Sequence, residues 1–162
     1  MSTCGKCGET YRWKCKSCRN KKLQDQRQND HTCLDCGCKY DRGRHGKRTR
    51  CDSCYGEHRQ ATTLLHAASQ RAKSRGIGFD LDLEWVRGGL RSGCPMTGEK
   101  YVIGQGTNYS NRHPLTPSID KVNPKLGYTK DNCRVVSWFY NMAKQQWSDE
   151  EVLELCKKIV QQ

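Results

Sequence analysis

Long apolar runs and aromatic residues are scarce in this chain of 162 residues, of which only 34% are apolar and 8% aromatic. No apolar run approaches the roughly 18 residues that a membrane-spanning helix needs, so we expect no membrane span. The N-terminal sequence has no apolar stretch suited to a signal peptide, and we therefore expect a reducing, cytoplasmic compartment. Structural disulfides are not expected there, and a large apolar core is not expected to account for the whole chain.

Cysteine, by contrast, is abundant, with 12 residues. In a reducing compartment paired thiols more often hold metal than form disulfides. Most of these cysteines form C-x₂-C pairs, whose spacing aims two sulfurs at one ion, and a structural Zn²⁺ takes four such ligands. We therefore expect two structural Zn²⁺ ions. The ligands are Cys4, Cys7, Cys15 and Cys18 in the first site, and Cys33, Cys36, Cys51 and Cys54 in the second.

An internal repeat supports this pairing of ligands. The segment Thr3–Gly8 matches the segment Thr32–Gly37, and the closing pairs match as well. A polar run that permits a helix follows each closing pair, so each module resembles a treble-clef finger. Cys38 stands two residues after Cys36 and is an alternative to it as a ligand. The unpaired cysteines are expected to be small buried residues, namely Cys94, Cys133 and Cys156.

Positive charge dominates the chain, with 29 Lys plus Arg against 17 Asp plus Glu and a formal net charge of +12. Within the second cysteine module, a glycine-containing loop carries a dense basic cluster. Such a loop is suited to following the phosphates of a nucleic acid, since their neutralisation releases counterions. The residues that we expect to contact DNA are Arg42, Arg44, Lys47, Arg48 and Arg50 in this loop, with Arg71, Lys73 and Arg75 further along the chain.

Two helices are predicted after the cysteine modules. The first covers residues 57–75 and has an apolar stripe through Leu64, Leu65 and Ala68, which we interpret as core packing. The second follows Asp82, a plausible N-cap. Residues 101–117 are rich in Gly, Asn, Ser and Pro, and they predict a long loop.

A strand, a loop, a second strand and a helix are predicted next. Residues 117–122 form the first strand, 123–128 the loop and 133–136 the return strand, and Ser137 caps the helix that follows. On that helix Asn141 and Lys144 lie three residues apart and share one side. This order is a ββα unit.

At these positions the chain resembles the HNH, or ββα-metal (His-Me finger), endonucleases, in particular small phage and restriction-type members. The matching segments cover residues 61–146 and are listed in chain order: Arg71 to Gly76, Cys94 to Gly98, Ser118-Ile119-Asp120-Lys121, Gly127-Tyr128, Asp131-Asn132, Val135-Val136-Ser137, Asn141 and Lys144. The resemblance implies a nuclease that hydrolyses phosphodiester bonds of DNA, expected to be double-stranded, in a bacterial or phage-infected cell.

The resemblance also implies a role for individual residues. Asp120 and Asn141 would hold one divalent cation, and oxygen ligands of this kind suit Mg²⁺ or Mn²⁺. Asn132 would brace the loop between the strands. Lys144 is included among the catalytic residues because of its place beside Asn141.

The chain departs from the family directly after the metal-binding acid, where Lys121 replaces the usual histidine. A lysine with an ordinary pKa near 10.4 is protonated at neutral pH and cannot act as a base, so we interpret Lys121 as a clamp on the phosphate. Tyr128, in the Gly-Tyr pair of the loop, is the first candidate for activating water. His113 is the second candidate.

The last predicted helix opens with a capping box at Ser148 and carries an apolar side: Val152, Leu153, Cys156, Ile159 and Val160. We expect this helix to close the core, and the alternative is an interface in a homodimer. The predicted fold is a small, zinc-stabilised α+β protein with a first Cys₄ module (1–30), a second (31–60) and a ββα-metal domain (61–162). The alternative to a nuclease is a non-catalytic zinc-finger protein that binds DNA.

Overall fold

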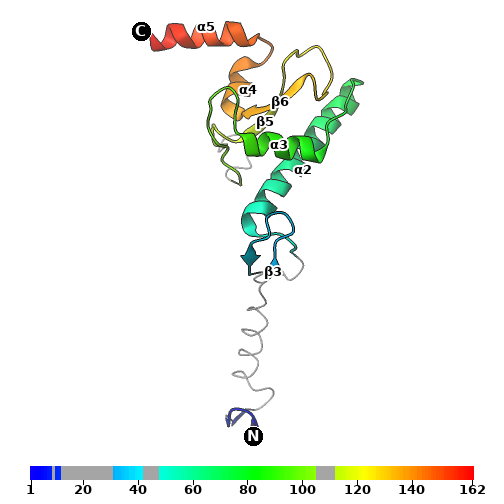
Figure 1. Cartoon of the computed structure of the whole chain (residues 1–162), viewed down its shortest axis with the longest axis vertical. Helices are drawn as coiled ribbons and strands as arrows, with labels where there is room; N and C mark the ends of the chain where they lie inside the picture. The colour runs from blue at the N-terminus through cyan, green and yellow to red at the C-terminus, as the bar shows by residue number, and fades with distance from the viewer. Residues whose placement is uncertain (9, 12–30, 42–47, 105–111) are drawn as a thin grey trace. The chain divides into compact units, whose positions relative to one another are not determined.

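The computed structural model describes residues 1–8, 10–11, 31–41, 48–104 and 112–162. The chain forms two compact units, Met1–Tyr55 and Gly56–Gln162 (Figure 1). The fold is a small α+β arrangement of short two-stranded sheets and helices. The division into three domains at residues 30 and 60 remains a prediction.

Two short antiparallel hairpins lie in the first unit. β1 (Ser2–Thr3) pairs with β2 (Thr10–Tyr11), and β3 (His31–Thr32) pairs with β4 (Lys39–Tyr40). In each turn a glycine amide donates to the carbonyl of the first cysteine, from Gly8 to Cys4 and from Gly37 to Cys33, both at 2.9 Å. These glycines have φ values of 73° and 70°, a left-handed conformation that favours glycine. The repeat in sequence is therefore a repeat in backbone conformation.

The longest helix is α2 (Asp52–Arg75), which begins before the expected residue 57 and ends where the sequence predicts. The difference arises at the N-terminal end, where the second member of the last C-x₂-C pair already belongs to the first turn of the helix. The buried side of α2 consists of Ala61, Ala68 and Ala72. These small side chains leave room for neighbouring elements to approach closely.

The ββα unit has the predicted order. Asp82 caps α3 (Leu83–Ser92), and its carboxylate accepts from the Trp85 amide at 2.8 Å. The hairpin follows as β5 (Pro117–Lys121) and β6 (Cys133–Ser137), and Ser137 then caps α4 (Trp138–Lys144). The register of the hairpin places Asp120 directly opposite Arg134.

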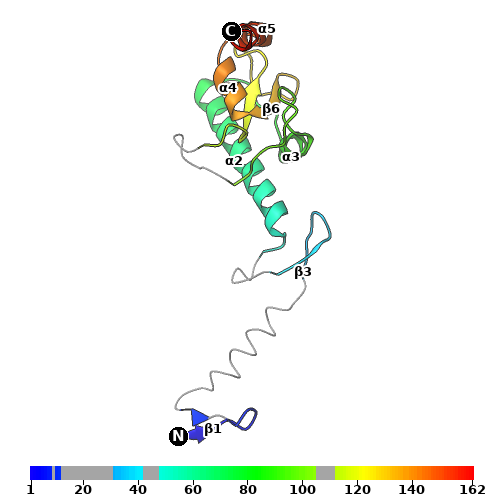
Figure 2. The ribbon, with the colours of Figure 1, turned by 90° about the vertical axis from the view of Figure 1, so that its left-hand side faces the viewer.

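The hairpin has a different environment on each of its faces, as strand alternation requires. Ile119 and Val135 pack in a cluster with the alanines of α2 and with α3. Val136 packs in a second cluster with Cys94 and Tyr140. The elements around the hairpin can be followed in Figure 2. The polar residues Ser118 and Asp120 are out of phase with Ile119 and therefore face α4, which contacts both of them.

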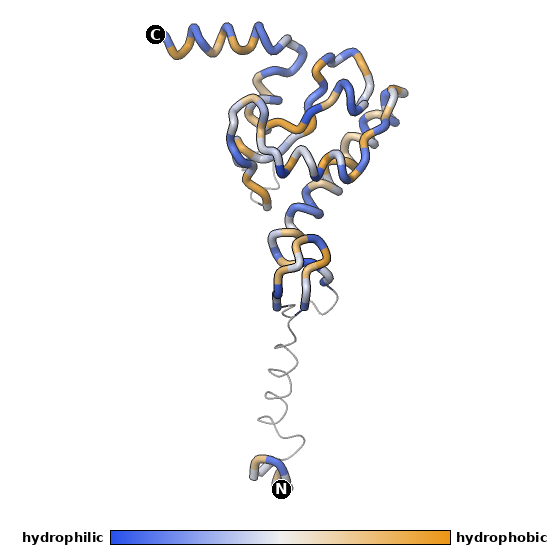
Figure 3. The backbone as a smooth tube through the Cα atoms, in the orientation of Figure 1, coloured by the Kyte–Doolittle hydropathy of each residue, from blue (hydrophilic) through white to orange (hydrophobic). Residues whose placement is uncertain are grey.

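The C-terminal helix α5 (Asp149–Val160) begins with the predicted capping box at Ser148. The expectation that its apolar side closes the core is wrong beyond its first turn. Val152 is buried, whereas Ile159 and Val160 are 73% and 86% exposed. The second cluster is complete at Val152, and α5 continues away from the hairpin beyond it (Figures 1 and 3).

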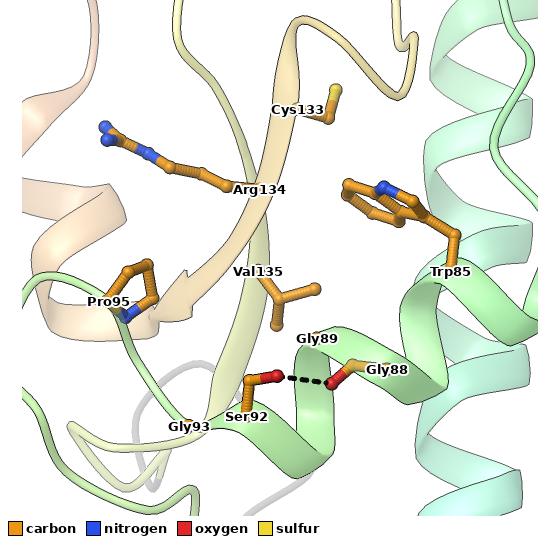
Figure 4. A pocket seen from close by; sticks show the side chains of 9 residues that line it. All are labelled: Trp85, Gly88, Gly89, Ser92, Gly93, Pro95, Cys133, Arg134 and Val135. Carbon is orange, nitrogen blue, oxygen red and sulfur yellow. Dashed lines mark hydrogen bonds between the residues drawn. The ribbon is translucent and has the colours of Figure 1, made fainter.

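The contact between α3 and β6 has no space for a larger residue at Gly89. A Cβ atom there would lie 2.5 Å from Cγ2 of Val135, whose branched side chain cannot easily move aside. The adjacent Gly88 faces open space. Figure 4 shows both glycines and Val135 at this contact.

We predict that Gly89→Ala lowers the free energy of unfolding by about 1–2 kcal/mol, because overpacking outweighs the gain in helix propensity. Gly88→Ala is the matched control and should raise stability by about 0.5–1 kcal/mol. Thermal unfolding of the two variants measures the difference. Equal midpoints would show that α3 and β6 are not in close contact.

Candidate functional site

A cluster of thiols lies between the β3–β4 turn and the start of α2. The sulfur atoms of Cys33, Cys36, Cys38 and Cys51 all lie within 4.8 Å of one another. The turn between the strands brings the first three together, with the Cys33 amide donating to the Cys38 carbonyl at 2.9 Å. Four thiols at this spacing could hold a metal ion.

A fifth thiol, Cys54, lies near those of Cys33, Cys36 and Cys51, which contribute to raising its pKa. Cys38 therefore joins Cys36 in the cluster and does not simply replace it. Hydrogen bonds to Cys36 and Cys51 raise the pKa of Cys38 to about 12, and burial raises the pKa of Cys54. Thiols this close together cannot all lose their protons without strong repulsion between the thiolates. A bound divalent cation would supply the compensating positive charge.

The proposed ligands of the first module are only partly described. Cys4 is partly buried and begins the turn that ends at Gly8, and Cys7 is exposed and lies within that turn. Cys15 and Cys18 lie outside the described residues. The four-cysteine site of this module therefore remains a prediction.

We predict that Cys38→Ser and Cys54→Ser each leave the metal content of the protein nearly unchanged, because four thiols remain in either variant. The double variant Cys38→Ser/Cys54→Ser keeps only three thiols and should lose one bound zinc per chain. The double variant Cys36→Ser/Cys54→Ser should lose it for the same reason. Metal analysis after dialysis against a chelator measures this. Loss of zinc from the Cys54→Ser variant alone would show that Cys38 is not an available ligand.

Asp120 is the most constrained acid of the ββα unit, with only 3% of its surface exposed. Its Oδ2 accepts from Nε and Nη2 of Arg134, at 3.0 and 2.9 Å. Its Oδ1 accepts from Nζ of Lys144 at 3.3 Å. A buried carboxylate is costly unless it is paired, and here two cations compensate it.

Lys144 is fully buried, at 0% exposure, which is rare for a lysine. Its ammonium also donates to the carbonyls of Lys121 at 2.9 Å and Val122 at 3.3 Å. Three oxygen atoms from the end of β5 thus surround one positive charge. The Asp120 carboxylate and these two carbonyls therefore form an environment that favours a cation.

Asn141 lies one turn before Lys144 on α4 and contacts the same strand. Its Nδ2 donates to Oγ of Ser118 at 2.7 Å and to the carbonyl of Ile119 at 3.3 Å. Within the described part of the chain, no hydrogen bond to its Oδ1 is present. The two residues predicted to bind a divalent cation therefore lie on facing elements, and Asn141 contacts the residues just before Asp120.

Sequence reasoning missed the partners of Asp120. Arg134 bridges Asp120 to Asp149 at the start of α5, with Nη1 at 2.8 Å from Oδ2 and Nη2 at 2.5 Å from Oδ1 of Asp149. The hydroxyl of Tyr140 donates to Oδ1 of Asp149 at 2.6 Å. The sequence did contain a signal for these partners. Arg134 stands between Cys133 and two valines in an otherwise apolar strand, and a buried charge requires a partner.

The loop between the strands holds Lys121 and Tyr128 together. The Lys121 ammonium donates to the carbonyls of Pro124 at 2.6 Å and Leu126 at 2.9 Å, and it lies 5.2 Å from the centre of the Tyr128 ring. Tyr128 is 5% exposed, and its hydroxyl accepts from Nε of Arg71 at 3.0 Å. In the part of the chain that the structure describes, neither side chain hydrogen-bonds to the Asp120 carboxylate.

Asn132 connects the two ends of the same loop. Its Nδ2 donates to the carbonyls of Asn123 at 3.0 Å and Gly127 at 2.9 Å, and its Oδ1 accepts from the Asn123 amide at 3.0 Å. His113 lies in the turn before β5, where its Nδ1 accepts from the Leu115 amide at 3.1 Å. The structure thus gives each of these two side chains a local structural contact.

Several of the basic residues expected to contact DNA have intramolecular partners. Arg48 forms an ion pair with Asp52, and Arg50 contacts Asp35 with Nε 2.8 Å from Oδ2. Lys73 and Arg75 are exposed near the end of α2. Arg42, Arg44 and Lys47 lie outside the described residues.

An open pocket of about 440 Å³ lies on the other face of β6, lined by residues of α3 and of the hairpin. Figure 4 shows Trp85 and Val135 in this pocket, whereas the side chain of Arg134 points away from them. The guanidinium of Arg134 instead binds Asp120 and Asp149. Arg134 also lines the pocket, so the pocket adjoins the Asp120 site through this residue.

Comparison with known proteins gives one similar structure. No protein-family model matches the chain, and no curated protein matches it. A solved structure of the rare-cutting HNH restriction endonuclease PacI is 17% identical, with 80% of this chain and 92% of that chain covered and a TM-score of 0.46. A similarity of this size leaves the function to be argued from the site itself. Among the described residues, no helix combines the length and apolar composition that crossing a membrane requires.

The ion pair between Arg134 and Asp149 predicts an acid-sensitive stability. Hydrogen bonds from Arg134 hold the pKa of Asp149 below its ordinary value of 3.8. This stabilisation is present above that value and is lost as the pH falls through the folded-state pKa. We predict that Asp149→Asn lowers the free energy of unfolding by about 1–3 kcal/mol at pH 7. Below about pH 4 this variant should lose less stability than the unmodified protein does.

Urea unfolding at several pH values measures this effect. Glu150→Gln is the control, since it removes the same charge from the adjacent, exposed position. Parallel pH profiles for Asp149→Asn and the control would contradict the prediction.

Proposed function

We propose that this protein is a metal-dependent DNA endonuclease of the HNH type, with its hydrolytic site between β5 and α4. The observation that carries the proposal is the burial of Asp120 among charged groups at that place. Apolar residues of similar volume would usually serve stability as well or better than a buried ion pair. A buried carboxylate facing an amide and two cations is therefore a candidate for function.

The donors at this position are suited to a hard divalent cation. Asp120 supplies carboxylate oxygens and Asn141 an amide oxygen, which are ligands that Mg²⁺ and Mn²⁺ prefer. A cation held by Asp120 and Asn141 would stabilise the negative charge that develops on the phosphate and the leaving oxygen. Lys144 already places a positive charge beside Oδ1 of Asp120, and it would have to shift for a cation to use that atom.

The surrounding residues support distinct parts of the same chemistry. Asn132 holds the loop that presents Lys121 and Tyr128. Lys121 would clamp a phosphate after releasing the carbonyls that it now contacts. Tyr128 remains the first candidate for activating water and His113 the second. Arg71, which donates to the Tyr128 hydroxyl, would hold that hydroxyl in a fixed position.

The thiol cluster supports the remaining part of the proposal, which concerns DNA binding. A Zn²⁺ ion at Cys33, Cys36, Cys51 and either Cys38 or Cys54 would stabilise the second module. The basic residues that we expect to contact DNA, Arg42 to Arg50, belong to that module. Salt-sensitive binding to phosphates is the expected result.

A second function is a non-catalytic DNA-binding protein, and one observation favours it. Both carboxylate oxygens of Asp120 are engaged by cationic side chains, Arg134 and Lys144. In a protein without catalysis, this network would serve only to connect the hairpin to α4 and α5. Cleavage assays separate the two functions.

We predict that the zinc-loaded protein nicks or linearises supercoiled plasmid when Mg²⁺ or Mn²⁺ is added. Asp120→Asn and Asn141→Ala should each lower the rate by roughly 100-fold or more, because a metal contributes several kcal/mol to transition-state stabilisation. Retention of DNA in a gel-shift assay should persist in both variants.

Asp131→Asn is the matched control, since Asp131 is an exposed acid between β5 and β6 and its change should leave cleavage unchanged. Asp120→Asn keeps the size of the side chain, so that circular dichroism can verify folding in each variant. No cleavage by the unmodified protein with either metal, together with salt-sensitive retention of the plasmid, would identify the non-catalytic protein.

A further inference from the structure

The apolar stripe of α5 remains uncovered in the single chain. Val152, Leu155 and Ile159 follow the spacing of three and four residues that aligns side chains along one side of a helix. Leu155 and Ile159 are 60% and 73% exposed, and Val152 is buried against its own unit. Trp147, directly before the N-cap, is 51% exposed beside the base of the helix.

Beyond its first turn, α5 has little packing against its own chain to support it. The helix has 12 residues and extends away from the hairpin (Figures 1 and 3). Isolated helices of this length are marginal in water, and most helical stability in proteins comes from packing an apolar face. The capping box at Ser148 secures only the first turn.

The charges of α5 are divided between its two halves. The acids Asp149, Glu150, Glu151 and Glu154 lie in the first half, and the bases Lys157 and Lys158 lie in the second. A second copy of the same helix is complementary to this pattern only when it runs in the opposite direction. A parallel copy would place like charges beside each other.

The complementarity extends to single residues. Glu151 and Lys158 are seven residues apart and therefore lie on the same flank of the apolar stripe. In an antiparallel pair centred between Glu154 and Leu155, Glu151 of each copy is opposite Lys158 of the other. Ile159 of each helix then reaches the base of its partner, where Trp147 is exposed.

We propose that α5 is a dimerisation helix that packs antiparallel against α5 of a second copy of this chain. Leu155 lies near the twofold axis, and Glu151 and Lys158 form two symmetric ion pairs across the interface. In the single chain Lys158 contacts Glu154, with Nζ 2.7 Å from Oε1. Exposed pairs of this kind are weak, so they do not prevent the exchange of partners.

The dimer is expected to be weak and dependent on concentration. A 12-residue helix is about 18 Å long, and one face of it covers less than the roughly 800 Å² per partner of a stable interface. We expect dissociation in the micromolar range. Sedimentation equilibrium over roughly 1–200 µM, in reducing buffer without DNA, measures it.

The test uses two charge-reversed variants, Glu151→Lys and Lys158→Glu. Because the Glu151 carboxylate also accepts from the Ser148 amide at 2.7 Å in the capping box, Glu151→Gln is measured beside Glu151→Lys to separate loss of the cap from reversal of the charge. Each charge-reversed variant alone places like charges opposite each other at both symmetric pairs, so its own dimer should weaken about tenfold or more. An equimolar mixture restores opposite charges at both pairs, and it should form a heterodimer at least as tight as the unmodified dimer. Lys157→Glu is the matched control, because Lys157 lies on the outward side of the helix.

A further variant tests the apolar stripe. Leu155→Glu with Ile159→Glu should abolish the dimer while circular dichroism shows a folded chain, since both residues are exposed in the single chain. A monomer at every concentration of the unmodified protein would overturn the proposal. A dimer whose affinity the mixture does not restore would overturn the antiparallel pairing. Because no outcome depends on cleavage, failure here is distinct from failure of the proposed nuclease.

Discussion

The cross-strand ion pair between Asp120 and Arg134 is the interaction on which the ββα unit depends. It lies within a two-stranded sheet, and it connects to α4 through Lys144 and to α5 through Asp149. Removal of either charge would leave its partner buried without compensation, which usually costs several kcal/mol. The same network therefore orients the candidate catalytic carboxylate and holds the last two helices to the hairpin.

One face of the hairpin packs against apolar and small residues, and the other face carries the polar candidate site. Ile119 and Val135 pack against the small residues of α2 and against Gly89 of α3, where the elements approach closely. The opposite face carries Asp120 and contacts Asn141 and Lys144. A rigid apolar contact on one side holds the polar site on the other in a defined geometry, as a catalytic constellation requires.

The first unit obtains its order from a different source. Its strands have two residues each, and Cys33 is the buried apolar residue that its described part contributes to a core. Five thiols lie near the start of α2, and a metal ion bound there would supply the cohesion that a core of this size lacks. The presence of five thiols where four suffice gives this site a choice of ligand between Cys38 and Cys54.

Local sequence pattern determined where the capped helices α3, α4 and α5 begin. The caps at Asp82, Ser137 and Ser148 and the glycine turns after Cys4 and Cys33 follow from short-range hydrogen bonds, which neighbouring residues specify. Tertiary structure alone decided that Arg134 pairs with Asp120, that Cys38 joins the thiol cluster, and that α5 passes beyond the core. Those outcomes depend on contacts between residues that are distant in sequence. The spacing of apolar residues along one helix or strand does not specify which other element packs against it.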